Sequence, residues 1–252
     1  MTRTIAEKPT VSFLTTPPTP CPYLEGRMER KVVTSLGGMT SSRFFQALSL
    51  AGFRRSHHLA YVPACPDCDA CVSVRIVVDQ FSRKRSLART WRKNAGLTAV
   101  EQPPVATDEQ YALFMKYLRF RHPGGDMADM SESDYVFMVE DTPVDSKLVE
   151  FRDAKGALVA ACLADRLPDG YSAVYSFFDP DLDPQGLGNF MVLWLIERSR
   201  QAKLPYVYLG YWIDGCRKMS YKQRFAPLEG LKDGEWVPMA DILNDPNMKN
   251  AD

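Results

Sequence analysis

The chain has no excess of charge of either sign and no long apolar run. Its 252 residues contain 31 Lys and Arg against 31 Asp and Glu. No global field therefore draws it to nucleic acid, and any RNA contact must use a local patch. The longest apolar stretch, around Phe190 to Ile196, is far shorter than the roughly 20 residues that span a bilayer. Met1 to Pro20 lacks the apolar core of a secretory signal. We expect a soluble, cytoplasmic protein.

Several catalytic patterns are also missing. The three histidines, His57, His58 and His122, show no metal-ligand spacing with the cysteines. The sequence has no Ser-His-Asp order and no P-loop, so it gives no case for covalent hydrolysis or nucleoside triphosphate use. Hydrophobic residues make up 45% of the chain, which is long enough to bury a substantial core as one large domain or two small ones.

The first half of the chain is rich in turns and shows few periodic segments. The expected elements are a helix at about 41–51, a strand at 72–78 and a helix at about 82–94. The stretch 101–106 carries Pro103 and Pro104 and is predicted to be a linker between two modules.

In the second half the pattern becomes more regular. Thr107 and Gln110 have capping-box spacing at the start of a helix that runs to about residue 121, and Ser131 with Asp134 offers a second helix start. The elements expected after residue 147 are strands at 148–152, 157–166 and 171–178, a helix at about 187–202 and a strand at 206–209. This is the order of the GNAT acyltransferase core, which predicts an α+β fold with a mostly antiparallel sheet.

Six cysteines without a secretory signal argue against a disulfide framework and for metal binding or reactive thiols. Cys65, Cys68 and Cys71 form a C-x2-C-x2-C run, and Cys21 is the candidate fourth ligand. Three close thiolates and a remote one suit zinc or an iron-sulfur cluster. The alternative is a tight turn of buried free cysteines, which behave as small hydrophobic residues.

The helix expected at 82–94 carries a dense basic face beside Trp91. Such a patch neutralises phosphates, which makes it a candidate nucleic-acid surface. The alternative is a solvated surface helix, the usual fate of a charge run. The basic residues are Arg83, Lys84, Arg85, Arg89, Arg92 and Lys93.

The turn that begins at Gln185 opens a helix after a strand, where free N–H groups and the helix dipole can hold an anion or an oxyanion. The GNAT pyrophosphate signature is [Q/R]-x-x-G-x-[G/A], and Asp183 stands at its first position, where it opposes a coenzyme A phosphate. This departure favours a GNAT relative with another acyl donor. Downstream, the polar and aromatic segment Leu209 to Phe225 suits a site or, alternatively, a packed C-terminal loop.

Four segments together resemble the arginyltransferase family and, within it, the bacterial branch of aspartate/glutamate leucyltransferases. They are CPYLEGRMER from Cys21, GFRRSHHLAYVPACPDCDACVSVRI from Gly52, FMKYLRFRHPGGDM from Phe114 and YLGYWIDGCRKMSYKQRFAPLE from Tyr208. The resemblance covers nearly the whole chain in order. It implies an N-terminal cysteine-containing domain, residues 1–100, and a C-terminal GNAT-like domain, residues 101–252. Eukaryotic relatives are associated with an iron-sulfur cluster on the N-terminal cysteines.

The resemblance implies transfer of leucine from leucyl-tRNA to the α-amine of proteins that begin with Asp or Glu, which marks them for degradation in the N-degron pathway. Arginine is the alternative donor. The basic helix would then bind tRNA. No ATP or other cofactor is required, because the aminoacyl ester already supplies the driving force.

Residue chemistry suggests the catalytic roles in that reaction. Backbone amides near Gly186 to Asn189, in the turn begun by Gln185, are candidates to stabilise the oxyanion, with Tyr211 or Lys218 as donors. Asp214 is the candidate to orient the incoming amine.

An acidic acceptor needs a cationic pocket, because an Arg side chain offers a bidentate fork for a carboxylate. The candidates are Arg54, Arg55 and Arg75; the alternative for each is structural pairing with a local acid.

Two rival functions remain. The meander, glycine turn and helix also suit a coenzyme A-dependent N-acetyltransferase, which tight coenzyme A binding would support. A non-catalytic RNA-binding or redox-sensing module would bind RNA without aminoacyl transfer, and it leaves the C-terminal motif without a purpose.

Overall fold

The computed structural model describes residues 11–37, 42–121 and 130–245, so His122 and the first residues of the chain lie outside it. The strands are β1 (Leu14–Thr15), β2 (Thr19–Pro20), β3 (Met28–Glu29), β4 (Lys31–Ser35), β5 (Arg54–Ser56), β6 (Leu59–Pro63), β7 (Val72–Val77), β8 (Thr98–Gln102), β9 (Ser146–Arg152), β10 (Leu158–Leu167), β11 (Gly170–Phe178), β12 (Tyr206–Trp212), β13 (Leu228–Lys232) and β14 (Glu235–Pro238). The helices are α1 (Ser42–Leu50), α2 (Arg85–Lys93), α3 (Asp108–Arg121), α4 (Glu132–Glu140), α5 (Leu187–Gln201) and α6 (Met239–Leu243), with the 3-10 helices η2 (Pro180–Gln185) and η3 (Ser220–Phe225).

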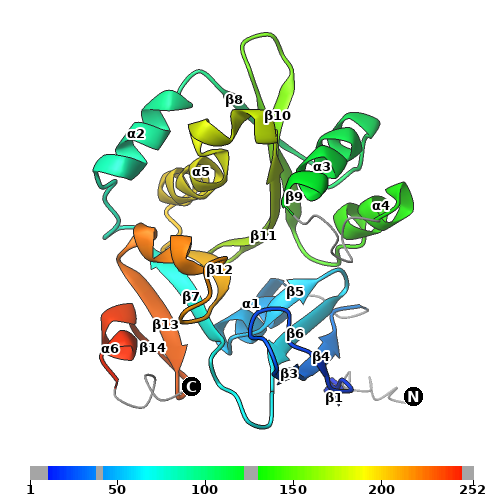
Figure 1. Cartoon of the computed structure of the whole chain (residues 1–252), viewed down its shortest axis with the longest axis vertical. Coiled ribbons are helices and arrows are strands. Elements are labelled where there is room, and N and C mark those ends of the chain that lie inside the picture. Colours follow the sequence, from blue (N-terminus) through cyan, green and yellow to red (C-terminus); the bar gives the residue numbers. More distant parts are fainter. Residues whose placement is uncertain (1–10, 38–41, 122–129, 246–252) are drawn as a thin grey trace, which may run out of the picture.

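The fold is organised around an eight-stranded sheet in the order β14-β13-β7-β12-β11-β10-β9-β8. Neighbouring strands run antiparallel, apart from β11 and β12, which run parallel. Helices α2 and α5 lie on one side of the sheet and α3 and α4 on the other (Figure 1). The structure therefore confirms the α+β class and the expected order of meander, turn, helix and strand.

Burial on both faces explains the apolar sequence of β10. Ala160 and Cys162 belong to the core cluster under α5, whereas Ala161 and Leu163 belong to the cluster under α3. Residues that alternate along a strand point to opposite faces, so a strand covered on both sides reads as a continuous apolar run. Because helices cover both faces, the middle of the sheet is held rigidly.

The N-terminal residues form a second, smaller sheet in the order β1-β4-β6-β5, next to the hairpin of β2 and β3. Its apolar residues share a core cluster with the larger sheet, where Phe45 of α1 and Ala60 of β6 pack with Leu167 and Tyr208. This contact brings β5, with Arg54 and Arg55, against the centre of the larger sheet. The sequence pattern did not predict these short strands.

The expected linker at 101–106 overlaps strand β8, which pairs with β9 along the edge of the larger sheet. Strand β7 lies inside the same sheet, between β12 and β13. The sheet thus takes strands from both sides of residue 100, and the division into domains 1–100 and 101–252 stays a prediction. No helix in the described part of the chain has the length and apolar character needed to cross a membrane.

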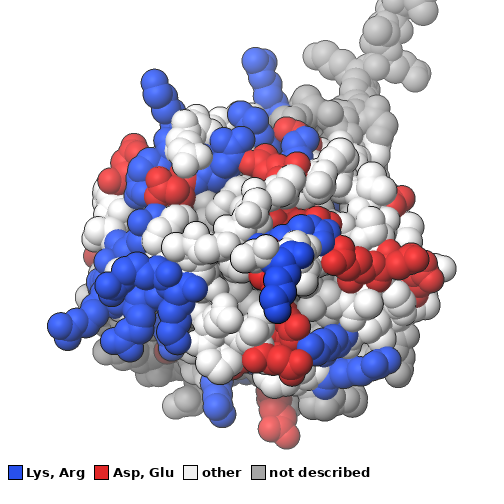
Figure 2. Space-filling view, turned by 90° about the horizontal axis from the view of Figure 1, so that it is seen from above, with Lys and Arg blue, Asp and Glu red and all other residues white. Residues whose placement is uncertain are grey.

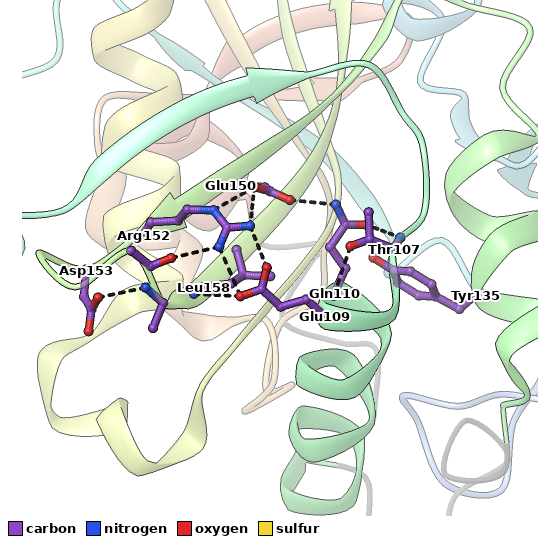
Figure 3. A network of polar contacts seen from close by, with 10 residues as sticks. Thr107, Glu109, Gln110, Tyr135, Glu150, Arg152, Asp153 and Leu158 are labelled. Atoms are coloured by element: carbon purple, nitrogen blue, oxygen red, sulfur yellow. Dashed lines mark hydrogen bonds and ion pairs between the residues drawn. The ribbon is translucent and has the colours of Figure 1, made fainter.

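A buried polar network fastens α3 and α4 to the sheet (Figure 3). Gln110 donates from Nε2 to Glu150 Oε1 at 2.7 Å and accepts from the Tyr135 hydroxyl at 3.2 Å. The other oxygen of Glu150 accepts from Arg152, which also forms a double hydrogen bond to Glu109. The backbone N–H of Thr107 donates to Gln110 and its hydroxyl accepts from the Gln110 N–H, which confirms the predicted capping box.

We expect Glu150→Ala to lower the free energy of unfolding by about 2 kcal/mol, mainly because it leaves the buried Gln110 amide without its acceptor, and also because it breaks a half-buried charge pair with Arg152. Glu109→Ala is the matched control, since it removes the exposed partner of the same Arg152 and should cost less than about 1 kcal/mol. Urea unfolding at equilibrium measures both. If both variants lose the same free energy of unfolding, burial adds nothing to the stability that the network provides.

Candidate functional site

The centre of the larger sheet contains a gap between two neighbouring strands. Strands β11 and β12 pair only from Gly170 to Ser172 with Tyr206 to Tyr208. Beyond that point β11 stays paired with β10, and β12 stays paired with β7 as far as Trp212. Gly210, at a φ of 78°, sits where the register of β12 shifts. The two strands therefore part and open a V-shaped notch in the sheet.

Arg54, from the smaller sheet, fills this notch. Its side chain donates from Nη2 to the backbone oxygen of Ala173 at 3.2 Å, and a Cβ on Gly210 would lie 3.6 Å from its Nε. Arg54 is only 6% exposed, and burial lowers the pKa of its guanidinium. Among the described residues it has no carboxylate in ion-pair distance. Glycine suits position 210 because its φ of 78° is one that other residues rarely adopt.

Lys222 in η3 is a second buried basic side chain. It contacts Tyr211, the residue that follows Gly210 in β12. Its Nζ donates to the backbone oxygen of Tyr211 and lies 3.3 Å from the sulfur of Met219. Lys222 is 4% exposed, and burial together with the nearby charge of Arg54 lowers its pKa to about 7. Sequence reasoning missed Lys222. The usable signal was the spacing of Met219, Lys222 and Phe225 by three residues, the period of a 3-10 helix with a buried face.

A cavity of about 250 Å³ opens at the start of α5. Its lining residues are Tyr117, Phe120, Arg121, Phe178, Asp183, Gly186, Gly188, Asn189 and Tyr221. The expected anion-binding turn, Gly186 to Asn189, therefore does line a cavity. Burial raises the pKa of the Tyr221 hydroxyl to about 12, so this group stays protonated at neutral pH.

The turn before α5 is held from both sides. Lys116 of α3 pairs with Asp179 and Asp181, each at 2.6 Å. On the other side, Asn94 donates to the backbone oxygen of Gln185 at 3.0 Å, and Lys93 donates to that of Pro184. These contacts fix the backbone amides at the start of α5 before any ligand arrives.

The four predicted catalytic residues do not share this cavity. Tyr211 is buried, and its hydroxyl lies within hydrogen-bond distance of the backbone oxygens of Gly52 and Tyr61, to one of which it can donate at a time. Asp214 is exposed and accepts from the N–H of Gly215, and Lys218 is exposed. Gln185 lies in the turn next to the cavity. The geometry places only Gln185 close to the proposed oxyanion site.

Two of the three candidate acceptor arginines are already paired. Arg55 makes a double hydrogen bond to Asp165, at 2.7 and 2.8 Å, and both side chains are fully buried. Arg75 pairs with Glu229 at 2.7 Å and lies against the rings of Tyr206 and Trp236. This pairing favours the structural alternative for both. Of the three arginines, only Arg54 has no acidic partner among the described residues.

Helix α2 presents the predicted basic face to solvent. Five of the six side chains, Lys84, Arg85, Arg89, Arg92 and Lys93, are exposed. Arg83 is half-buried, pairs with Glu197 at 2.6 Å and lies 4.0 Å from the centre of the Trp91 ring. Blue side chains gather at the left of Figure 2, on the side where α2 lies in Figure 1. Because Lys93 and Asn94 hold the turn before α5, this basic face adjoins the α5 cavity.

The four cysteines of the predicted cluster line one small cavity of about 60 Å³ with Tyr23, Tyr61 and Tyr211 among its walls. Cys65 and Cys68 form an isolated β-bridge. Burial and the three neighbouring thiols raise the pKa of Cys71 to about 12. The topology thus gathers Cys21 with the C-x2-C-x2-C run. As the side chains stand, no three His, Cys, Asp or Glu residues of the described ranges form a group that could hold a metal ion.

Comparisons with known proteins match both halves of the chain. The family model for the N terminus of arginine-tRNA-protein transferase matches residues 19–89, and the model for its C terminus matches residues 109–232. An aspartate/glutamate leucyltransferase of Paramagnetospirillum magneticum is 58% identical over 90% of this chain and 93% of its own. That of Gluconacetobacter diazotrophicus is 52% identical over 95% and 92%.

Solved structures with a similar arrangement are distant in sequence. FemX is 9% identical, with a TM-score of 0.48 over 78% of this chain and 68% of its own. L-PGS from Bacillus licheniformis is 12% identical, with a TM-score of 0.46 over 57% and 46%. The family models and the two bacterial relatives carry the assignment: the chain belongs to the arginine-tRNA-protein transferase family.

Proposed function

We propose that this enzyme transfers leucine from leucyl-tRNA to the α-amine of proteins that begin with Asp or Glu, and that the product is marked for degradation. The observation that carries the proposal is the 58% identity, over 90% of the chain, to a relative named aspartate/glutamate leucyltransferase. The cavity at the start of α5 suits the aminoacylated end of a charged tRNA, and the basic helix α2 beside it suits the RNA phosphates.

The reaction needs alignment more than a strong base. The α-amine attacks the carbonyl carbon of the aminoacyl ester, the bond to the ribose oxygen breaks, and the proton lost by the amine balances the one gained by the ribose. An α-amine has a pKa of roughly 7.7 to 8.0, so an appreciable fraction is nucleophilic at neutral pH. Gly188 and Asn189 line the cavity in the first turn of α5, where backbone N–H groups have no partner within the helix, so these groups are the proposed donors to the oxyanion.

The donor binds with its acceptor end in the α5 cavity and its phosphates on α2. Tyr117, Phe120 and Tyr221 offer aromatic faces on which a base can stack. Asp183 on the cavity wall repels a phosphate, which disfavours coenzyme A as the donor. Exposed Arg85, Arg89 and Arg92 attract the RNA backbone beside the cavity.

The cysteine cavity is the proposed site of a bound zinc ion or iron-sulfur cluster. The donor set has suitable chemistry, because Cys21, Cys65, Cys68 and Cys71 are soft thiols that line one small cavity; binding would require them to draw together, since as they stand they form no metal-holding group. A bound cation would oppose the burial and the neighbouring thiols that raise the pKa of Cys71, and it would fasten the loop after β6 to the residue before the β2–β3 hairpin turn.

The central test uses purified protein, tRNA charged with radioactive leucine or arginine, and peptides that differ only in starting with Asp, Glu or Ala. We expect leucine on the Asp and Glu peptides alone. Arginine transfer would correct the donor, and absence of transfer from either tRNA would overturn the proposal in favour of the coenzyme A-dependent reading.

Charge reversal on α2 tests the tRNA surface. Arg89→Glu with Arg92→Glu should raise KM for leucyl-tRNA at least tenfold and flatten its dependence on salt, because each lost phosphate contact lowers the logarithmic salt slope by about 1. The control is Arg43→Glu with Lys203→Glu, which reverses two other exposed charges on α1 and after α5. If both double variants behave alike, a local α2 contact is refuted.

Metal content tests the cysteine site. Protein purified without chelators and without oxygen should carry zinc or iron, measured by elemental analysis, and Cys68→Ser should lose most of it. Cys162→Ser is the control, since Cys162 is buried in β10 among apolar neighbours. If the two variants carry the same amount of metal per protein, any bound metal lies outside the cysteine cavity.

A further inference from the structure

Arg54 and Lys222 share one unusual property, because both are buried basic side chains without an acidic partner. Neither forms an ion pair within the described ranges, and their exposed fractions are 6% and 4%. The nearest acid acting on Arg54, Asp165, already accepts two hydrogen bonds from Arg55. Leaving a buried charge uncompensated is costly, so natural proteins rarely keep one without a use.

The two cations lie together. Arg54 packs over Gly210, and Lys222 donates to the backbone oxygen of Tyr211, the next residue of β12. The charge of Arg54 also contributes to lowering the pKa of Lys222, which places them within electrostatic reach of each other. Two adjacent, buried basic groups form a strong site for one anion, because solvent screens buried charges less.

The notch lies between the two cavities. Tyr61, the register partner of Arg54, and Tyr211, whose backbone oxygen accepts from Lys222, both line the cysteine cavity. Tyr221, whose ring centre lies 5.9 Å from Lys222 Nζ, lines the α5 cavity. Lys222 therefore lies directly behind a wall residue of the cavity that the acceptor amine would enter.

We infer that Arg54 and Lys222 together bind the side-chain carboxylate of the acceptor's N-terminal Asp or Glu. This inference rests on the proposed function and adds to it a residue, Lys222, that no sequence pattern singled out. Arg54 supplies a fork for the two oxygens, since only one of its N–H groups is used by Ala173. Lys222 adds the second charge that distinguishes a carboxylate from an amide.

Selectivity between acids and their amides is the measurement. Wild type, Arg54→Met and Lys222→Met are assayed at saturating leucyl-tRNA with peptides that differ only in starting with Asp, Asn, Glu or Gln. We expect the ratio of kcat/KM for Asp over Asn to fall about 10- to 100-fold in each variant, the loss of one charge-assisted hydrogen bond. Arg54→Lys keeps the charge but loses the fork, so its ratio should lie between those of wild type and Arg54→Met.

Thermal melting shows whether the variants are folded at the assay temperature. Each Met variant removes a buried basic group but also the donor to one backbone oxygen, so the melting temperature alone does not decide the role, and the Asp over Asn ratio is compared only between folded proteins. Arg200→Met is the matched control, because Arg200 also donates to backbone oxygens, those of Val78 and Phe81, but lies away from the notch. It should keep the Asp over Asn ratio.

A second measurement needs no disruptive variant. In wild-type protein labelled with 13C-lysine, the Lys222 side-chain resonance should shift on addition of the Asp peptide and not of the Asn peptide. No shift, or an unchanged ratio in both folded Met variants, would overturn the anion site. An equal loss on all four peptides would also overturn it, because the cations would then act on the reaction centre. A wild type that transfers leucine without preferring Asp to Asn, or not at all, would instead refute the proposed function.

Discussion

The parting of β11 and β12 leaves backbone groups in the middle of a sheet without their usual partners, and such groups need hydrogen bonds when buried. The side chains that answer this need are Arg54, which donates to Ala173, and Lys222, which donates to Tyr211. The Arg and Lys side chains can only donate hydrogen bonds. Using them to satisfy the unpaired carbonyls therefore also brings positive charge into the notch. The architecture of the sheet and the electrostatics of the site therefore have one origin.

The elements around the notch are held rigidly by packing and by hydrogen bonds. Helices cover both faces of the meander, and the network around Glu150 fixes α3 on the strand next to β10. Lys116 of α3 pairs with Asp179 and so links this helix to the turn before α5. Asn94 links the same turn to the end of α2. A reaction that depends on aligning two substrates gains most from such a frame, because little ordering is left for the moment of binding.

Local patterns predicted the elements whose signals lie close together in sequence. The capping box of Thr107 and Gln110, the meander and the basic face of α2 all appear as expected. Long-range pairing was beyond such patterns: the bond of Arg55 to Asp165 joins residues 110 positions apart and favours a structural role for a residue that the sequence offered as an acceptor candidate. Strand β8 was hidden by the prolines that follow it, and Lys222 by a polar segment whose buried face appears only once η3 is folded.

Strand β7 has a consequence for how the polypeptide matures on the ribosome. It lies between β12 and β13, so a strand made early must wait for two strands that emerge more than 120 residues later. Until then both of its edges are open, and open apolar edges invite pairing with other chains. Contacts of such separation in sequence also slow folding. Synthesis of this enzyme therefore passes through a long interval in which β7 has neither neighbour, and during that interval the strand is open to pairing with other chains.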